Sequence, residues 1–303
     1  SDVCSSDLSQ AWACGSFFFV LALEIGVSKE RIGSRLSGAA FTRGMLADQE
    51  KAAVLREFGG QGLITDVLGV IGDGKEATVY CCAADASTGV ELLAAKVYRA
   101  QKFRAFAHAR DYAGARVVLD VRKGRAMKAG TEKGRRMAHH AWIDWEWETL
   151  CALHDAGVSV PSPLAASDDA ILMEYLGDRE GPAPQLRHVE LTIEQARAAL
   201  ARLLQDVERM LDLHRVHGDL SAYNVLWWQE RPVIIDVPQS VDLHASRDGL
   251  PHLLRDVRNL ERYFARYGLS SDGFAEGAWR RYLRSDALAG LFRRSPRLDL
   301  TAA

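Results

Sequence analysis

Three oxygen-bearing side chains in the second half of the sequence constrain this chain more than any other feature. Asp219 and Asn224 lie five residues apart in the run VHGDLSAYNVL, and Asp236 ends the apolar run VIID. The first two are expected on a loop between a long helix and a strand, and the third at the end of the next strand. A carboxylate beside a reacting phosphate can accept a hydroxyl proton, while an amide oxygen and a second carboxylate can hold Mg²⁺. Ordinary turn residues would explain the pattern poorly, because apolar strands flank it.

The order of the surrounding elements predicts an α+β fold with two lobes. Strands are expected at 63–71, 78–83, 92–98 and 170–176, with a Trp-rich helix at 141–156 between the last two. After the linker GDREGPAPQ, Thr192 and Gln195 predict a capping box that opens a helix reaching Leu213. The remaining elements expected are short strands at 225–228 and 233–236 and helices near 250–267 and 273–285.

Three regions follow from this order. Residues 1–62 are expected to be an N-terminal extension with a short helix at about 45–58, residues 63–176 a β-rich lobe, and residues 177–303 a small, mostly helical lobe. Within the first lobe, residues 99–136 contain twelve Lys or Arg against three Asp or Glu. Because this segment lacks a sustained apolar period, it is predicted to be a basic, mobile loop with short helical pieces.

Composition excludes several classes of protein. A net charge of −2 argues against a generic nucleic-acid-coating protein, and 48% apolar residues allow a buried core. Five cysteines without a C-x-x-C spacing favour a reducing, cytoplasmic compartment. The longest uncharged run, residues 8–23, is shorter than the roughly 20 residues that span a bilayer, so no membrane segment is expected.

The first lobe contains two further features that suit phosphate chemistry. Gly72 and Gly74 lie between two expected strands, where the backbone could close over a polyphosphate, although a plain hairpin turn is the favoured interpretation of this motif taken alone. Lys75 completes G-x-x-x-x-G-K from Gly69, but Glu76 stands where a Walker A loop needs Ser or Thr. A Walker A loop is therefore excluded.

Lys96 stands alone inside the apolar strand LLAAKVYR. A buried ammonium needs an anionic partner, whereas an edge-strand Lys could instead extend to solvent. Asp144, Glu146 and Glu148 on the Trp-rich helix are the available carboxylates. Glu146 is the predicted partner of Lys96, and Glu148 is the second candidate.

The H-x-D-x-x-x-x-N run, the strand lysine and the later aspartate resemble the protein-kinase fold. GKEATVY, WIDWEWETLCALHDAGVSVPSP, VHGDLSAYN and IIDVPQSV resemble the RIO family in particular, over roughly residues 63–265. As in that family, no A-P-E motif follows Asp236. The short, irregular N-terminus is closer to the branch without a winged helix.

The resemblance implies ATP and Mg²⁺ as cofactors and a role for each matching residue. Asp219 would be the catalytic base, Glu146 would orient Lys96, and Asn224 and Asp236 would bind the metal. The implied ATP-binding residues are Gly72, Gly74, Lys75, Lys96, Met173, Glu174, Tyr175, Leu176 and Ser221, with residues 173–176 forming the hinge that binds adenine.

The resemblance implies a serine/threonine kinase acting on a protein acceptor or on itself. The family also suggests a second mode of action, an ATPase switch on a ribosomal particle in which Asp236 is transiently phosphorylated. An aminoglycoside-type small-molecule kinase shares H-G-D-L-x-x-x-N, but only 127 residues follow the first lobe here. A pseudokinase that binds RNA through residues 99–136 is the third hypothesis, although intact Lys96, Asp219, Asn224 and Asp236 argue against it.

Overall fold

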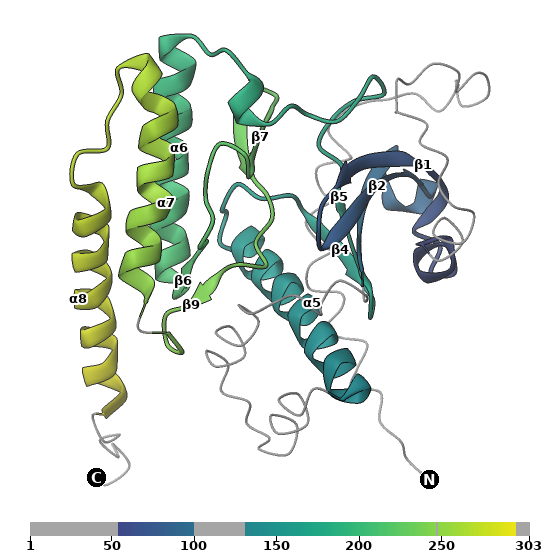
Figure 1. The fold of residues 1–303 in the computed structure, drawn as a ribbon, viewed down its shortest axis with the longest axis horizontal. Coiled ribbons are helices and arrows are strands. Elements are labelled where there is room, and N and C mark those ends of the chain that lie inside the picture. Colours follow the sequence, from purple (N-terminus) through teal and green to yellow (C-terminus); the bar gives the residue numbers. More distant parts are fainter. Residues whose placement is uncertain (1–53, 100–130, 247, 295–303) are drawn as a thin grey trace, which may run out of the picture.

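The first lobe is built on one antiparallel sheet (Figure 1). The structure is a computed structural model, which describes residues 54–99, 131–246 and 248–294. The strands, in sheet order, are β1 (Ile64–Asp73), β2 (Ala77–Ala84), β3 (Leu92–Tyr98), β5 (Ala170–Glu174) and β4 (Pro163–Ala166). The four expected strands are confirmed, although β5 ends two residues early. β4 was not expected, because the prolines of VPSP predict only an extended path.

The two faces of this sheet have different partners because successive side chains of a strand alternate between faces. Tyr80, Cys82 and Ala95 lie on one face and form a core with Val54 and Phe58 at the start of the described chain. The other face carries Lys96, opposite Val79 in the β2–β3 register. The lysine therefore faces away from the core that contains Phe58.

The helix α5 (Glu132–Asp155) begins nine residues before the predicted start. The hydroxyl of Thr131 caps it by accepting a hydrogen bond from the Gly134 N–H at 3.1 Å. The prediction of a basic loop is therefore wrong for residues 132–136, and residues 100–130 lie outside the described residues. Of the short helix expected at 45–58, the part up to residue 53 is also outside, and the described end is a single π-helical turn, Leu55–Gly59.

The second lobe is mostly helical. Its helices are α6 (Ile193–Asp212), α7 (Gly249–Phe264) and α8 (Phe274–Arg294), which lie side by side (Figure 1). The predicted capping box is confirmed: Thr192 Oγ1 accepts from the Gln195 N–H at 3.2 Å, and Gln195 Oε1 accepts from the Thr192 N–H at 3.0 Å.

Two small ribbons complete the second lobe between α6 and α7. One pairs β6 (Arg215–Val216) with β9 (Val241–Asp242), and the other pairs β7 (Val225–Trp228) with β8 (Arg231–Ile234). The strand expected at 233–236 thus begins and ends two residues early. It stops before Asp236 because that residue has φ 65, a left-handed conformation that no strand contains. The order of sheet, helix and helical lobe confirms the α+β, two-lobed kinase-like fold.

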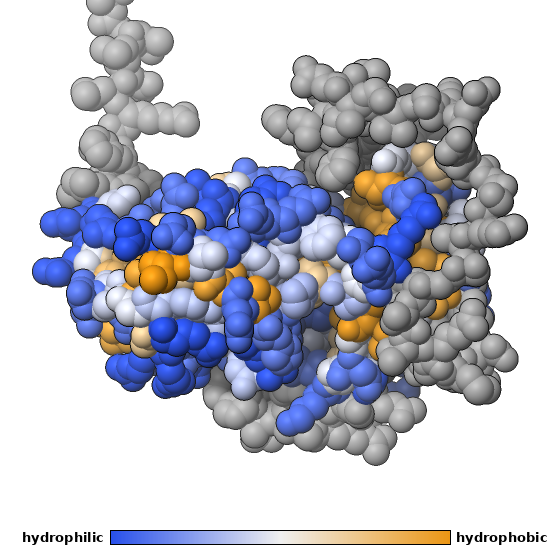
Figure 2. Space-filling view, turned by 90° about the horizontal axis from the view of Figure 1, so that it is seen from above, coloured by the Kyte–Doolittle hydropathy of each residue, from blue (hydrophilic) through white to orange (hydrophobic). Residues whose placement is uncertain are grey.

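In the view of Figure 2, hydrophilic residues predominate over the second lobe around a small apolar patch, and further apolar residues are exposed on the first lobe. Among the residues described here, no helix has the length and apolar character needed to cross a membrane.

Candidate active site

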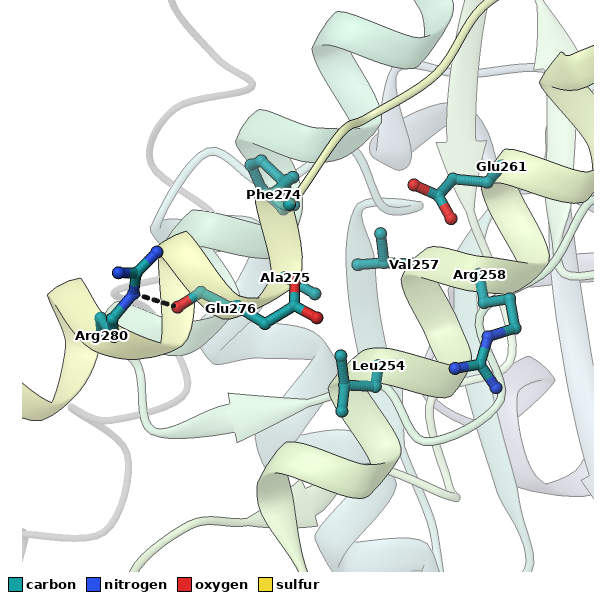
Figure 3. Close-up of a pocket in the computed structure, with 9 residues that line it drawn as sticks. Leu254, Val257, Arg258, Glu261, Phe274, Ala275, Glu276 and Arg280 are labelled. Carbon is teal, nitrogen blue, oxygen red and sulfur yellow. Dashed lines mark hydrogen bonds between the residues drawn. The ribbon is translucent and has the colours of Figure 1, made fainter.

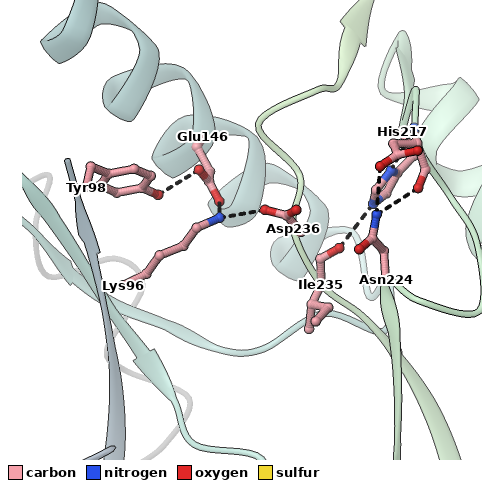
Figure 4. A network of polar contacts seen from close by, with 8 residues as sticks. Lys96, Tyr98, Glu146, His217, Asn224, Ile235 and Asp236 are labelled. Atoms are coloured by element: carbon pink, nitrogen blue, oxygen red, sulfur yellow. Dashed lines mark hydrogen bonds and ion pairs between the residues drawn. The ribbon is translucent and has the colours of Figure 1, made fainter. Parts of the chain in front are cut away.

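Lys96 binds two carboxylates that come from different lobes (Figure 4). Its Nζ lies 2.6 Å from Glu146 Oε1 on α5 and 2.7 Å from Asp236 Oδ1, which follows β8. The Lys96 side chain is 11% exposed and that of Glu146 is 4% exposed, whereas that of Asp236 is 46% exposed. The buried pair thus ends at an open carboxylate, on the side where a ligand can enter.

Burial explains why Glu146, and not its neighbours, pairs with Lys96. Glu146 is buried, whereas Asp144 and Glu148 on the same helix are exposed. The predicted ion pair is therefore confirmed. Tyr98 completes it by donating from its hydroxyl to Glu146 Oε2 at 2.6 Å, and burial raises the pKa of Tyr98 well above its ordinary value. The hydroxyl therefore stays protonated and holds the second oxygen of Glu146.

The charges in this cluster stabilise one another. Burial opposes the ammonium of Lys96, but Asp236 and Glu146 outweigh it, so the pKa of Lys96 lies above its ordinary value. The same ammonium lowers the pKa of Asp236. Lys96 is therefore a permanent cation beside an ionised carboxylate, an arrangement that suits the binding of a phosphate or a divalent ion.

Asp219 and Asn224 lie together on the loop between β6 and β7. Asn224 Nδ2 donates to the Asp219 main-chain oxygen at 2.9 Å and to Asp219 Oδ2 at 3.1 Å. Gly218 precedes them with φ 83, and a Cβ there would lie 2.5 Å from the Gln239 oxygen. Only glycine fits this turn. Ser221 lies on the same loop, where its main-chain oxygen accepts from the Asn224 N–H at 2.9 Å.

A buried aspartate anchors this loop through hydrogen bonds to its backbone. Asp256 on α7 is 1% exposed, and its two oxygens accept from the Gly218 N–H at 2.7 Å and the Leu220 N–H at 3.0 Å. Burial raises the pKa of Asp256 to about 7, although the two N–H donors lower it. Because its two partners flank Asp219, Asp256 sets the backbone on which Asp219 is presented.

Replacing Asp256 by Asn should lower the free energy of unfolding by about 1–3 kcal/mol, because a single amide oxygen cannot satisfy two buried N–H groups. Urea unfolding of the variant measures this loss. Asp248→Asn, at the exposed start of the same helix, is the matched control and should unfold like the parent chain. Equal stability of the two variants would contradict the anchoring role.

The segment after Asp236 is fixed to α5, which brings Glu146 and Asp236 to the same lysine. Trp145 Nε1 donates to the Ser240 main-chain oxygen at 3.2 Å. The guanidinium of Arg215 lies 4.3 Å from the centre of the Trp145 ring, a cation–π contact. These contacts join α5 of the first lobe to the segment of the second lobe that contains Asp236 and Ser240.

The glycine-rich turn lies at the end of the β1–β2 hairpin. The Gly74 N–H donates to the Ala77 oxygen at 2.9 Å, and Lys75 is exposed. Arg99 binds the carboxylate of Asp73 and donates to the Gly74 oxygen at 3.2 Å. A closed hairpin turn is therefore present, and its predicted contact with phosphates remains a prediction.

An apolar strip runs along the same sheet face as Lys96. Val79, Ala94 and Met173 lie on it together, in one cluster with Tyr175. The predicted hinge begins in β5 with Met173 and Glu174 and continues through Tyr175 and Leu176, whose main-chain oxygen accepts from the Ala183 N–H at 2.9 Å. The apolar strip and the Lys96 ammonium therefore lie on one face of the sheet.

A separate hollow of about 300 Å³ lies between α7 and the start of α8 (Figure 3). Its lining includes Leu254, Arg258, Glu261 and Phe274. None of the predicted site residues lines it, so it belongs to the packing of the second lobe and not to the Lys96 cluster.

Two residues of the site escaped the sequence analysis. Tyr98 lies two positions after Lys96, so strand alternation places both side chains on one face, and this spacing was a usable signal. Asp256 gave a weaker signal in the sequence, because an aspartate on an amphipathic helix normally faces solvent. Its contact with the loop spans 36–38 residues and comes from tertiary structure alone.

A β-rich lobe whose strand lysine pairs with a helix glutamate, set against an Asp219–Asn224 loop and Asp236, defines a protein-kinase-like fold. The family model described as "RIO domain" matches residues 78–275, about two thirds of the chain. The chain belongs to the RIO family.

Curated relatives agree with this family. Human "Serine/threonine-protein kinase RIO1" is 31% identical over 212 residues, which cover 69% of this chain and 35% of the relative. "RIO-type serine/threonine-protein kinase Rio1" of Haloferax volcanii is 34% identical over 211 residues, covering 68% of this chain and 65% of the relative. The protein of the same name from Thermoplasma acidophilum is 32% identical over 131 residues, covering 43% and 67%. The chain thus spans about a third of the human relative and about two thirds of the archaeal ones.

Proposed function

We propose that this protein is an ATP- and Mg²⁺-dependent serine/threonine protein kinase of the RIO type. The observation that carries the proposal is the position of Lys96, within 2.7 Å of both Glu146 and Asp236, at the open end of an apolar sheet face. The names of the relatives, which are serine/threonine-protein kinases, support the same chemistry. Family membership also favours it over an aminoglycoside-type kinase.

Each side chain then has a defined task. Lys96, oriented by Glu146, pairs with the nucleotide phosphates, and the strip containing Val79 and Met173 receives the adenine. Asp219 accepts the proton of the attacking hydroxyl, and the amide of Asn224 fixes its orientation. Catalysis of this kind depends mainly on positioning and charge neutralisation.

The donor set suits Mg²⁺. Asn224 donates from Nδ2 to two oxygens of Asp219, which leaves its Oδ1 for another partner. The side chain of Asp236 is 46% exposed. Hard oxygen ligands of this kind are those that Mg²⁺ prefers. Asn224 and Asp236 would hold the ion, which supplies positive charge to the phosphates when bound.

Asp236→Ala should abolish the gain in ATP affinity that Mg²⁺ confers, because it removes one of the two metal ligands. Affinity without Mg²⁺ should not fall, since Lys96 loses a competing carboxylate. Calorimetric titration with ATP, with and without Mg²⁺, measures both quantities. Asp168→Ala, at an exposed carboxylate, is the control and should keep the Mg²⁺ effect. An intact Mg²⁺ effect in Asp236→Ala would exclude Asp236 as a ligand.

The direct test of the proposed function follows the label from γ-labelled ATP in the presence of Mg²⁺. Label on Ser or Thr of the chain itself or of a protein acceptor supports the kinase. Free phosphate with a hydroxylamine-labile adduct would instead indicate the ATPase switch, in which Asp236 is transiently phosphorylated. Absence of any transfer would leave a binding module and overturn the proposal.

Binding to RNA or to a ribosomal particle is a separate part of the proposal. The basic composition of residues 99–136 supports it, because Lys and Arg neutralise phosphates independently of sequence. Replacing Arg122, Lys123 and Arg125 together by neutral residues should reduce the slope of log affinity against log salt concentration for a generic RNA. An unaltered slope would exclude residues 99–136 as the contact.

A further inference from the structure

A cluster of metal-binding side chains lies in the second lobe, apart from the Lys96 site. His214, His244 and Asp286 each place one ligand atom within 4.8 Å of the other two. The three residues come from different elements: His214 from the turn between α6 and β6, His244 from the turn after β9, and Asp286 from α8. Residues 72 positions apart in the chain thus converge on one point.

The backbone brings the two histidines together and holds them there. The Leu243 N–H donates to the His214 main-chain oxygen at 3.0 Å, which extends the β6–β9 ribbon to both turns. His214 has φ 56, an uncommon conformation for a residue with a Cβ. The two rings consequently lie with their centres 3.9 Å apart and their planes at 41°.

Tyr282 supplies the outer contact that ligating histidines usually have. His214 Nδ1 lies 3.1 Å from the Tyr282 hydroxyl, and Tyr282 precedes Asp286 by one helical turn on α8. If Nδ1–H donates to the phenol oxygen, Nε2 keeps its lone pair for a metal. The phenol is therefore joined to the imidazole, and the carboxylate of Asp286 lies within 4.8 Å of the ligand atoms of both histidines.

We propose that His214, His244 and Asp286 bind a divalent transition-metal ion of the Zn²⁺ type, which fastens α8 to the β6–β9 ribbon. Two imidazoles and one carboxylate are a typical zinc donor set, and His244 is exposed, so the fourth position is open to water. Tetrahedral coordination at Zn–N and Zn–O distances of about 2.1 Å places donor atoms about 3.4 Å apart. The observed separations, within 4.8 Å, would have to shorten by about 1 Å when the ion binds.

The test is calorimetric titration of the tag-free, chelator-treated chain with Zn²⁺, followed by Co²⁺ as a spectroscopic probe. Wild type should bind Zn²⁺ saturably, with tetrahedral Co²⁺ absorption bands and a higher melting temperature. His244→Ala and Asp286→Asn should each weaken the affinity at least about 10- to 100-fold and abolish the bands. His188→Ala, at an exposed histidine elsewhere in the same lobe, should bind like wild type.

Equal Zn²⁺ affinity in wild type and His244→Ala would place the binding elsewhere and overturn the proposal, as would the absence of saturable binding. Because His244 is exposed, its variant is expected to fold, so the test does not depend on the behaviour of Asp286→Asn. The readouts do not involve phosphoryl transfer, and failure here would leave the proposed kinase function untouched.

Discussion

Replacing Asp219 by Asn is expected to reduce phosphoryl transfer by about 10²- to 10⁴-fold, the usual contribution of a general base. Asparagine has nearly the shape of aspartate and can still meet the Asn224 side chain, which now lies 3.1 Å from Asp219 Oδ2. It cannot take up the hydroxyl proton, however. ATP binding should therefore remain close to wild type, and the loss should appear in kcat with little change in KM.

Steady-state assays with labelled ATP measure both constants, and thermal melting shows whether the variant is folded. Asp212→Asn, at the exposed end of α6, is the matched control, because it makes the same chemical change seven residues away. Retained turnover in Asp219→Asn would exclude Asp219 as the general base of the reaction.

The residues around Asp219 show which parts of the site a sequence can predict. The Asp219, Asn224 and Asp236 pattern is recognisable because loop and strand residues lie close in the chain, and the turn at Gly218 forces a glycine. Lys96 was noticeable because a lysine inside an apolar strand implies a buried ammonium, which is costly unless an anion pairs with it. Local chemistry of this kind is visible without any knowledge of the tertiary structure.

The parts that were missed depend on distant contacts. Asp256 contacts the loop that contains Asp219 across 36–38 residues, and the two-residue strands β6 and β9 exist because they pair with each other. The early start of α5 had a local signal, Thr131 followed by Glu132, but the surrounding basic residues suggested a loop. Sequence patterns therefore predicted the order of elements well and their ends less well.

The second large effect concerns stability as well as activity. Lys96→Met should lower the free energy of unfolding by about 3–5 kcal/mol, because it leaves the 4% exposed carboxylate of Glu146 without its cation. Tyr98 still donates to that carboxylate but cannot neutralise it. The variant should also lose ATP binding, since it lacks the cation that we propose pairs with the nucleotide phosphates.

Adding Glu146→Gln to Lys96→Met should restore most of the lost stability, because a neutral amide can accept from Tyr98 without a buried charge. Activity should not return, so the double variant separates the stabilising role of the pair from its proposed chemical role. Urea unfolding and ATP titration of the two single variants and the double variant measure both effects, with Lys133→Met, at an exposed lysine of α5, as the control. If the double variant is no more stable than Lys96→Met, the destabilisation does not arise from the unpaired Glu146, and the lost ion pair with Asp236 becomes its cause.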